Sequence, residues 1–226
     1  GPGNVPAYVH KDAKLKQAVN DIVLSKAFDN GMICASEQAA IVDTEHYKEF
    51  IELMKKHHVY FVNKEEKAKL EELVFGAKAN SKNCAGAKLN AQVVGKSAEH
   101  IAELAGFEVP KGTIILAAEV KEVGENEPLT REKLSPILAV IKSISTEDGI
   151  EKSRQMVELN GLGHSAAVHT QDEEVAEQFG KVVPACRILW NSPSSFGGIG
   201  DIYNALIPSL TLGCGSYGGN SVSGNI

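Results

Sequence analysis

The strongest constraint in the sequence is a regular succession of short apolar runs and longer amphipathic segments. The run at 114–118 has no polar alternation, which is typical of a strand buried on both faces of a sheet. Helical patterns of about 10–15 residues separate such runs, and this order favours a parallel sheet with right-handed crossovers. The sequence therefore predicts an α/β fold in which a mostly parallel sheet is flanked by helices, as one domain spanning residues 1–226.

The expected helices and strands follow from the spacing of apolar residues and from the capping and turn residues between them. Strands are predicted where compact apolar runs occur, at 5–10, 39–43, 92–95, 113–120, 137–141, 165–170 and 187–191. Helices are predicted where apolar residues recur at helical spacing, at 12–28, 46–57, 64–77, 98–105, 147–159 and 173–181. Thr44 and Asn63 are expected to cap two of these helices. The Gly-rich region 197–226 is expected to form a long ordered loop that runs over the sheet edge.

Composition excludes several classes of protein. Hydrophobic residues make up 43% of the chain and the net charge is −6, so a disordered chain is excluded and a nucleic-acid binder is disfavoured. The chain contains no apolar stretch of about 18 residues and no charged-then-apolar leader, so we expect a cytoplasmic protein without a membrane segment. His57, His58, His164 and His169 lack a third ligand at metal-binding spacing, so no metal site is expected.

The four cysteines do not form a zinc or redox pattern, because no CxxC occurs among Cys34, Cys84, Cys186 and Cys214. Cys34 differs from the others because it follows a helix end and a Gly turn and precedes a strand. Backbone N–H groups at such a junction lower the pKa of a thiol and stabilise an oxyanion. From the residues alone, Cys34 fits either a packing thiol or a nucleophile.

Two further motifs contain residues that could take part in catalysis or phosphate binding. His164 lies on a Gly-rich turn before a strand, where it fits either a general base or a capping side chain. The segment 213–218 matches GxGxxG, but it lies too near the chain end for a helix and second strand to follow, so we interpret it as loop glycine.

Several segments resemble the aldehyde dehydrogenase superfamily. They are the nucleophile segment 28–36, the Gly-rich segment 1–6, the Glu-containing segment 132–136, and the segments 161–165, 195–204 and 208–220. The last two are similar to the CoA-acylating aldehyde dehydrogenase part of bifunctional aldehyde–alcohol dehydrogenases. The resemblance extends over the whole chain and implies an aldehyde dehydrogenase-like catalytic domain.

The resemblance also implies what lies outside the chain. The family's NAD-binding domain, with an amide that helps form the oxyanion hole, is not found in it, nor is the iron-dependent alcohol dehydrogenase domain. The Glu that activates water in hydrolytic members would precede Gly1, and the strand that helps build the dimer would follow Ile226. We therefore expect the isolated fragment not to turn over NAD, and we expect the NAD-binding domain of the same protein as its partner.

The implied reaction is aldehyde, CoA and NAD to acyl-CoA and NADH, reversible, with acetaldehyde and acetyl-CoA as the natural substrates of fermentation and alcohol metabolism. Cys34 would form a thiohemiacetal and then a thioester, and His164 would act as acid and base near the CoA thiol. The implied cofactor-binding residues are Glu132 at the nicotinamide ribose and Phe196, Gly197 and Gly198, which would line the acyl and cofactor channel.

Two alternatives stay open. The chain fits a non-catalytic assembly domain of a larger dehydrogenase, because relatives of this kind form homo-oligomers. It also fits a cysteine acyltransferase or hydrolase that works without a nicotinamide. Selective alkylation of Cys34, and an acyl adduct on it, would distinguish catalysis from assembly.

Overall fold

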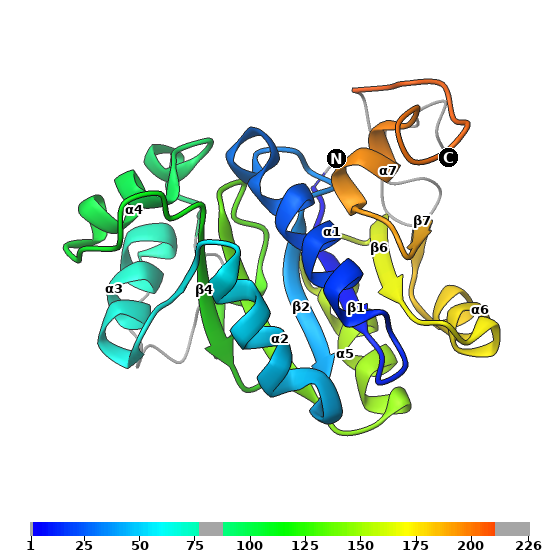
Figure 1. The fold of residues 1–226 in the computed structure, drawn as a ribbon. Helices are drawn as coiled ribbons and strands as arrows, with labels where there is room; N and C mark the ends of the chain where they lie inside the picture. Colours follow the sequence, from blue (N-terminus) through cyan, green and yellow to red (C-terminus); the bar gives the residue numbers. More distant parts are fainter. Residues whose placement is uncertain (1, 77–87, 211–226) are drawn as a thin grey trace.

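The computed structural model describes residues 2–76 and 88–210 (Figure 1). The strands of these ranges form one parallel sheet in the order β3-β4-β5-β2-β1-β6-β7. The strands are β1 (Val5–Val9), β2 (Glu37–Asp43), β3 (Val59–Phe61), β4 (Ile115–Val120), β5 (Ile137–Ser143), β6 (Gly163–His169) and β7 (Ala185–Trp190). The helices are α1 (Leu15–Ala27), α2 (Thr44–Lys56), α3 (Lys64–Phe75), α4 (Ala98–Ala105), α5 (Thr146–Asn160), α6 (Glu173–Val182) and α7 (Ser194–Ile199).

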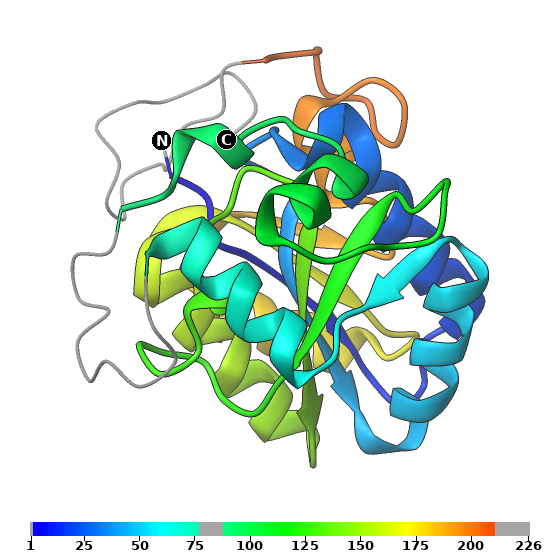
Figure 2. The same ribbon diagram turned by 90° about the vertical axis from the view of Figure 1, so that its left-hand side faces the viewer.

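Helices cover both faces of the sheet, which explains why the strand sequences do not alternate with polar residues. Successive side chains of a strand point to opposite faces. In β2, Ala40 and Val42 pack in the core under α1 and α2, whereas Ala39 and Ile41 pack in the core under α5 and α6. A third cluster joins α3 and α4 to the β4 end of that second face. Figure 2 shows the two helical layers on either side of the sheet. The predicted parallel α/β architecture is confirmed.

Most predicted elements are confirmed with small shifts at their ends. The clearest local agreement is at α3, where the Asn63 side chain accepts from the backbone N–H groups of Glu65 and Glu66, and Glu66 accepts from the Asn63 N–H. This capping box satisfies donors that the first helical turn leaves open. No helix in the described ranges has the length and apolar character needed to cross a membrane.

Three sequence predictions were wrong, and one strand was missed. The segment predicted as a strand at 92–95 forms a 3₁₀ turn, Ala91–Val93. Thr44 is the first residue of α2 and not its cap, which is Asp43. The short edge strand β3 was not predicted. Residues 197–199, expected in a loop, belong to α7.

The direction of the strands defines the edge at which the residues predicted to be reactive lie. All strands within the described residues run parallel, so every segment that enters one of them reaches the same edge, here called the amino edge. The arrowheads of β2, β4 and β6 in Figure 1 point away from this edge, and α7 lies beside it. The segments before β1, β2, β5 and β6 therefore meet there, although they are far apart in the sequence.

Candidate active site

The amino edge brings the sequence-predicted residues together. Cys34 lies just before β2, Glu132 lies before β5, and His164 is the second residue of β6. Open parallel sheets more often bind ligands at the carboxyl ends of their strands. This site lies at the opposite edge, because its residues come from the segments that enter the strands.

The loop that carries Cys34 has an unusual backbone. Asp29, Asn30 and Gly31 all have positive φ, at 50°, 50° and 69°. A side chain on Gly31 would place its Cβ 2.5 Å from the Ser135 carbonyl oxygen, so the loop lies directly against the segment before β5. The Asn30 amide donates to the Gly95 carbonyl oxygen over 3.1 Å. These contacts explain why the sequence needs Asn and Gly here, since both tolerate the left-handed region.

Cys34 and His164 form a pair. The Cys34 Sγ lies 3.2 Å from the His164 Nε2, and the His164 Nδ1 lies 3.0 Å from the Ser165 Oγ. His164 is fully buried, whereas Cys34 is partly exposed. In the tautomer in which Nδ1 donates to Ser165, the Nε2 lone pair faces the thiol. The geometry fits a nucleophile with an adjacent base that a third group orients.

The electrostatics keep this pair neutral at rest. Burial raises the pKa of the Cys34 thiol, although the positive charge of Arg187 acts in the other direction. Burial, and then the Arg187 charge, lowers the pKa of His164 to about 3. A thiol with a raised pKa beside an imidazole with a lowered one holds its own proton. His164 is therefore neutral at neutral pH, and its Nε2 has a lone pair that can accept a proton.

Gly3 permits the close approach of the first segment to the nucleophile. A Cβ at Gly3 would lie 2.0 Å from the Cys34 carbonyl oxygen and 3.2 Å from the His164 Cε1. The buried Asn4 side chain holds this segment by donating to the Thr130 and Met156 carbonyl oxygens over 2.9 and 2.8 Å. The Gly-rich start of the chain is thus a packing requirement of the site.

Glu132 supplies a carboxylate to the same site. Its Oε1 accepts from the Gly3 N–H over 2.8 Å, and the side chain is half-buried. Burial raises the pKa of Glu132, while the Gly3 hydrogen bond and the Lys26 charge act against that shift. Cys34 and Glu132 border one pocket of about 510 Å³. Its lining residues are Pro2, Met32, Ile33, Cys34, Glu132, Leu134, Ile199 and Leu210.

Comparisons with known proteins show the family to which the chain belongs. Residues 1–201 match the aldehyde dehydrogenase family. The chain belongs to this family. Aldehyde-alcohol dehydrogenase of Streptococcus pneumoniae serotype 4 is 71% identical over 226 residues, which cover 100% of this chain and 26% of that protein. The chain therefore spans about a quarter of that relative's length, and the predicted resemblance is confirmed.

Two solved structures of aldehyde dehydrogenases extend the comparison. The acetylating aldehyde dehydrogenase of Geobacillus thermoglucosidasius has 42% sequence identity and a TM-score of 0.87, over 96% of this chain and 46% of that one. The propionaldehyde dehydrogenase of Rhodopseudomonas palustris, solved with bound propionyl-CoA, has 25% identity and a TM-score of 0.76, over 90% of this chain and 43% of that one. The predicted aldehyde dehydrogenase-like fold is thereby confirmed.

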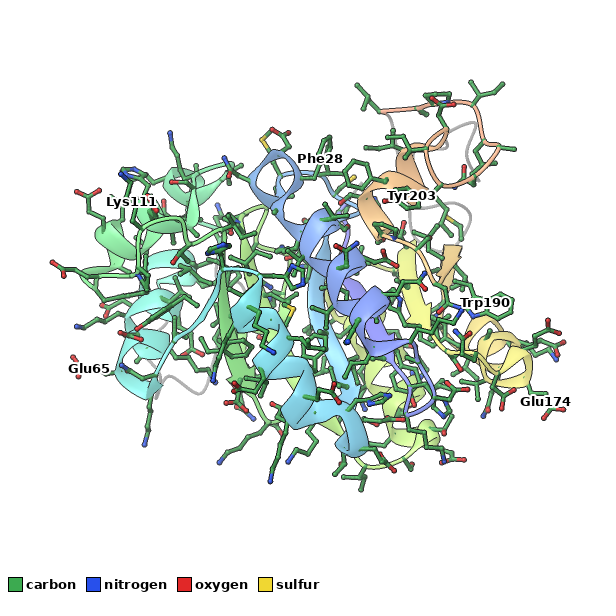
Figure 3. All side chains as sticks on the ribbon, viewed as in Figure 1. Phe28, Glu65, Lys111, Glu174, Trp190 and Tyr203 are labelled. Atoms are coloured by element: carbon green, nitrogen blue, oxygen red, sulfur yellow. The ribbon has the colours of Figure 1, made fainter. Side chains whose placement is uncertain are left out.

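The other residues predicted to bind the cofactor, Phe196, Gly197 and Gly198, lie on α7. Phe196 packs between Phe28 and Tyr203, with ring centroids 4.8 and 5.9 Å away, and Figure 3 shows Phe28 and Tyr203 near the amino edge. Gly197 packs on β7, where an added Cβ would lie 2.8 Å from the Leu189 side chain. Gly198 is buried, and α7 reaches the pocket through Ile199. Their assignment to the cofactor channel stays a prediction.

The other cysteines and the GxGxxG segment lie only in part within the residues that the structure describes. Cys186 is partly exposed, and its thiol donates to the His164 carbonyl oxygen over 3.2 Å. Cys84, Cys214 and the GxGxxG segment lie outside the described residues. No group of three or more His, Cys, Asp or Glu side chains within 2–76 and 88–210 is arranged to hold a metal ion. Sequence reasoning missed Ser165 as the partner of His164, because a serine in a buried strand carries no distinguishing signal.

Proposed function

We propose that this chain is the cysteine-bearing catalytic part of a CoA-acylating aldehyde dehydrogenase that interconverts an aldehyde and its acyl-CoA. The single observation that carries the proposal is the 3.2 Å contact between the Cys34 Sγ and the His164 Nε2, at a pocket that Glu132 also borders. The names of the relatives support the substrate class, since they include acetylating and propionaldehyde dehydrogenases. Acetaldehyde and acetyl-CoA are the substrates that we propose, with NAD as the nicotinamide cofactor, in the cytoplasm.

The acyl-transfer step needs only residues of this chain. Cys34 attacks the thioester carbonyl carbon of acyl-CoA, and its proton passes to the His164 Nε2. The new bond from the Cys34 sulfur to the carbonyl carbon replaces the bond to the CoA sulfur. His164 then gives the proton to the departing CoA thiolate, so CoA leaves as a thiol and Cys34 keeps the acyl group. No oxidant or reductant enters this step.

The redox step needs a hydride carrier, and the residues present fit one. Glu132 is a half-buried carboxylate on the wall of the pocket that contains Cys34, and a carboxylate suits the two hydroxyls of a nicotinamide ribose. A bound nicotinamide would supply hydride transfer to or from the carbon attached to Cys34. Glu132 would fix the ribose by accepting its hydroxyl hydrogen bonds, while Gly3 keeps the carboxylate in place.

The test uses the complete gene product that contains this chain. Incubation with acetaldehyde, CoA and NAD should produce NADH, and Cys34→Ala should abolish it. Cys186→Ser is the matched control, because it changes the other described thiol and keeps a donor for the His164 carbonyl oxygen; it should retain activity. NADH production by Cys34→Ala, or an equal loss in Cys186→Ser, would overturn the proposal.

A further inference from the structure

Lys133 is a buried lysine that the acyl-transfer chemistry does not use. Its side chain is fully buried, and its Nζ donates to three main-chain carbonyl oxygens, those of Gln38, Leu129 and Arg131, over 3.1, 2.6 and 2.7 Å. Lysine is almost never fully buried unless its donors are paired. The three oxygens belong to two separate segments, the turn before β5 and the first residues of β2. The amine therefore joins these two segments inside the protein.

The donor count of the amine fits this arrangement. Only the protonated amine has three N–H groups, one for each carbonyl oxygen. Burial, and then the charge of Lys26, lowers the pKa of Lys133, whereas the three carbonyl dipoles favour the protonated form. The neutral amine still has two N–H groups, enough for one oxygen of each segment. The link between the segments therefore exists in either protonation state.

A second contact between the same segments runs through the side chain of Gln38. Its Oε1 accepts from the Lys133 backbone N–H over 3.1 Å, and its Nε2 donates to the Ser36 carbonyl oxygen over 3.0 Å. Ser36 follows Cys34 by two residues. The backbone that leads from Cys34 into β2 is thus tied to Lys133 at two points, the Gln38 side chain and the Gln38 carbonyl oxygen.

The residues on either side of Lys133 face the pocket. Glu132 and Leu134 both line the pocket that contains Cys34, whereas Lys133 does not. Leu134 has a φ of 46°, in the left-handed region that is unfavourable for a residue with a Cβ and persists only where the surroundings fix it. Its carbonyl oxygen accepts from the Gly95 N–H over 3.0 Å, and Lys133 holds the residue before it. The lysine therefore restrains a strained segment of the pocket wall.

We propose that Lys133 is a positioning residue for Glu132: its amine ties the turn 128–131 to the start of β2, and so fixes the Glu132 carboxylate on the pocket wall as an acceptor for the ribose hydroxyls of a nicotinamide cofactor. This inference rests on the proposed function. Glu132 lies between the turn and Lys133, so a movement of the turn moves its carboxylate away from the Gly3 N–H, which is 2.8 Å from the Glu132 Oε1. A displaced carboxylate would bind a ribose diol less tightly, because hydrogen bonds weaken steeply as their geometry departs from the optimum.

The experiment separates nicotinamide binding from acyl transfer in the complete gene product. Cys34 is first acetylated with acetyl-CoA, and the loss of the acetyl group is then followed by mass spectrometry at increasing NADH concentrations. Lys133→Met should raise the NADH concentration that gives half the maximal rate by about tenfold, the cost of weakening one charged hydrogen bond. The rate of Cys34 acetylation, which needs no nicotinamide, should stay within about threefold of wild type.

Lys152→Met is the matched control. The Lys152 Nζ also donates to a main-chain carbonyl oxygen, that of Lys142 over 2.8 Å, but near the carboxyl end of β5. This substitution should change neither value. A double-mutant cycle then shows whether Lys133 acts through Glu132: in a Glu132→Gln background, Lys133→Met should change the half-saturating NADH concentration by less than about twofold.

Chemical rescue distinguishes hydrogen-bond donation from packing. Lys133→Ala leaves room for propylammonium, which has the same three N–H groups and the carbon chain that the substitution removes. Propylammonium should return the half-saturating NADH concentration to within about threefold of wild type, whereas tetramethylammonium, which has no N–H group, should not. The same variant, produced with propylammonium and then freed of it, replaces Lys133→Met if that variant does not fold.

Three results would overturn the positioning role. The first is a half-saturating NADH concentration that is unchanged in Lys133→Met, and the second is an equal effect of this substitution with and without Glu132. The third is a loss of Cys34 acetylation as large as the effect on NADH, which would mean that Lys133 only supports the fold. Failure of the proposed function is distinguishable, because the wild-type protein would then form no acetyl adduct on Cys34.

Discussion

Replacing Gly3 by alanine tests the geometry of the site with the smallest possible change. The added Cβ would lie 2.0 Å from the Cys34 carbonyl oxygen and 3.0 Å from its carbonyl carbon. Non-bonded heavy atoms reach their optimum at about 3.5–4.0 Å, so one segment must withdraw by 1 Å or more. Both of these Cys34 atoms belong to the backbone, so they cannot move away by a side-chain rotation. The loop that carries Cys34 and the segment that contains Gly3 must therefore move apart.

The expected magnitude follows from that displacement. A shift of about 1 Å in a reacting group costs roughly 10²-fold in rate. The same overpacking should lower the free energy of unfolding by about 1–3 kcal/mol. The assay is the rate at which acetyl-CoA acylates Cys34 in the complete gene product, followed by mass spectrometry, with thermal unfolding of the same samples.

Gly180→Ala is the matched control. Gly180 lies in α6, and a Cβ there would meet nothing within 4 Å. This substitution should stabilise the helix by up to about 1 kcal/mol and leave acylation unchanged. A Gly3→Ala variant that acylates Cys34 within about threefold of wild type would refute the packing argument, because a 10²-fold loss is required.

Three further predictions concern the Cys34–His164 pair and the stability of the fold. His164→Asn should slow Cys34 acylation by about 10²–10⁴-fold, measured by the same assay; an unchanged rate would exclude His164 as the base. Because the pKa of His164 is lowered to about 3 and that of Cys34 is raised, iodoacetamide alkylation of Cys34 should rise with pH into the alkaline range. A step near pH ~6.5 would contradict this. Asn63→Ala should lower the free energy of unfolding by about 1 kcal/mol, measured in urea, without changing Cys34 alkylation.

The fold was largely predictable because its strands are buried on both faces. Residues 115–118 of the run 114–118 are fully buried in β4, and such an unbroken apolar run is typical of a strand in a covered parallel sheet. β3 escaped prediction because it has only three residues at the edge of the sheet. α7 escaped because Gly197 and Gly198 are poor helix formers. The contacts of Ser194 with Glu37 and of Ser195 with Ser25 hold this helix in place.

The site was predictable only in part. Cys34 and His164 each stood out as reactive types on Gly-containing turns, but their 130-residue separation hides the contact that joins them. The sequence did not indicate that the Lys26 and Glu37 side chains are fully buried, because lysine and glutamate usually lie at the surface. These side chains are buried because α1, β2 and α7 pack together beside the loop that carries Cys34. Such tertiary placement overrides the local pattern.

The central claim is that Cys34 is an acyl-accepting nucleophile, and the mass of the Cys34 peptide after incubation with acetyl-CoA tests it most directly. The complete gene product should gain one acetyl group on that peptide, lose it when NADH is added, and show no gain in the Cys34→Ser variant. An unmodified Cys34 peptide after long incubation, or an acetyl group on Cys186 instead, would contradict the account.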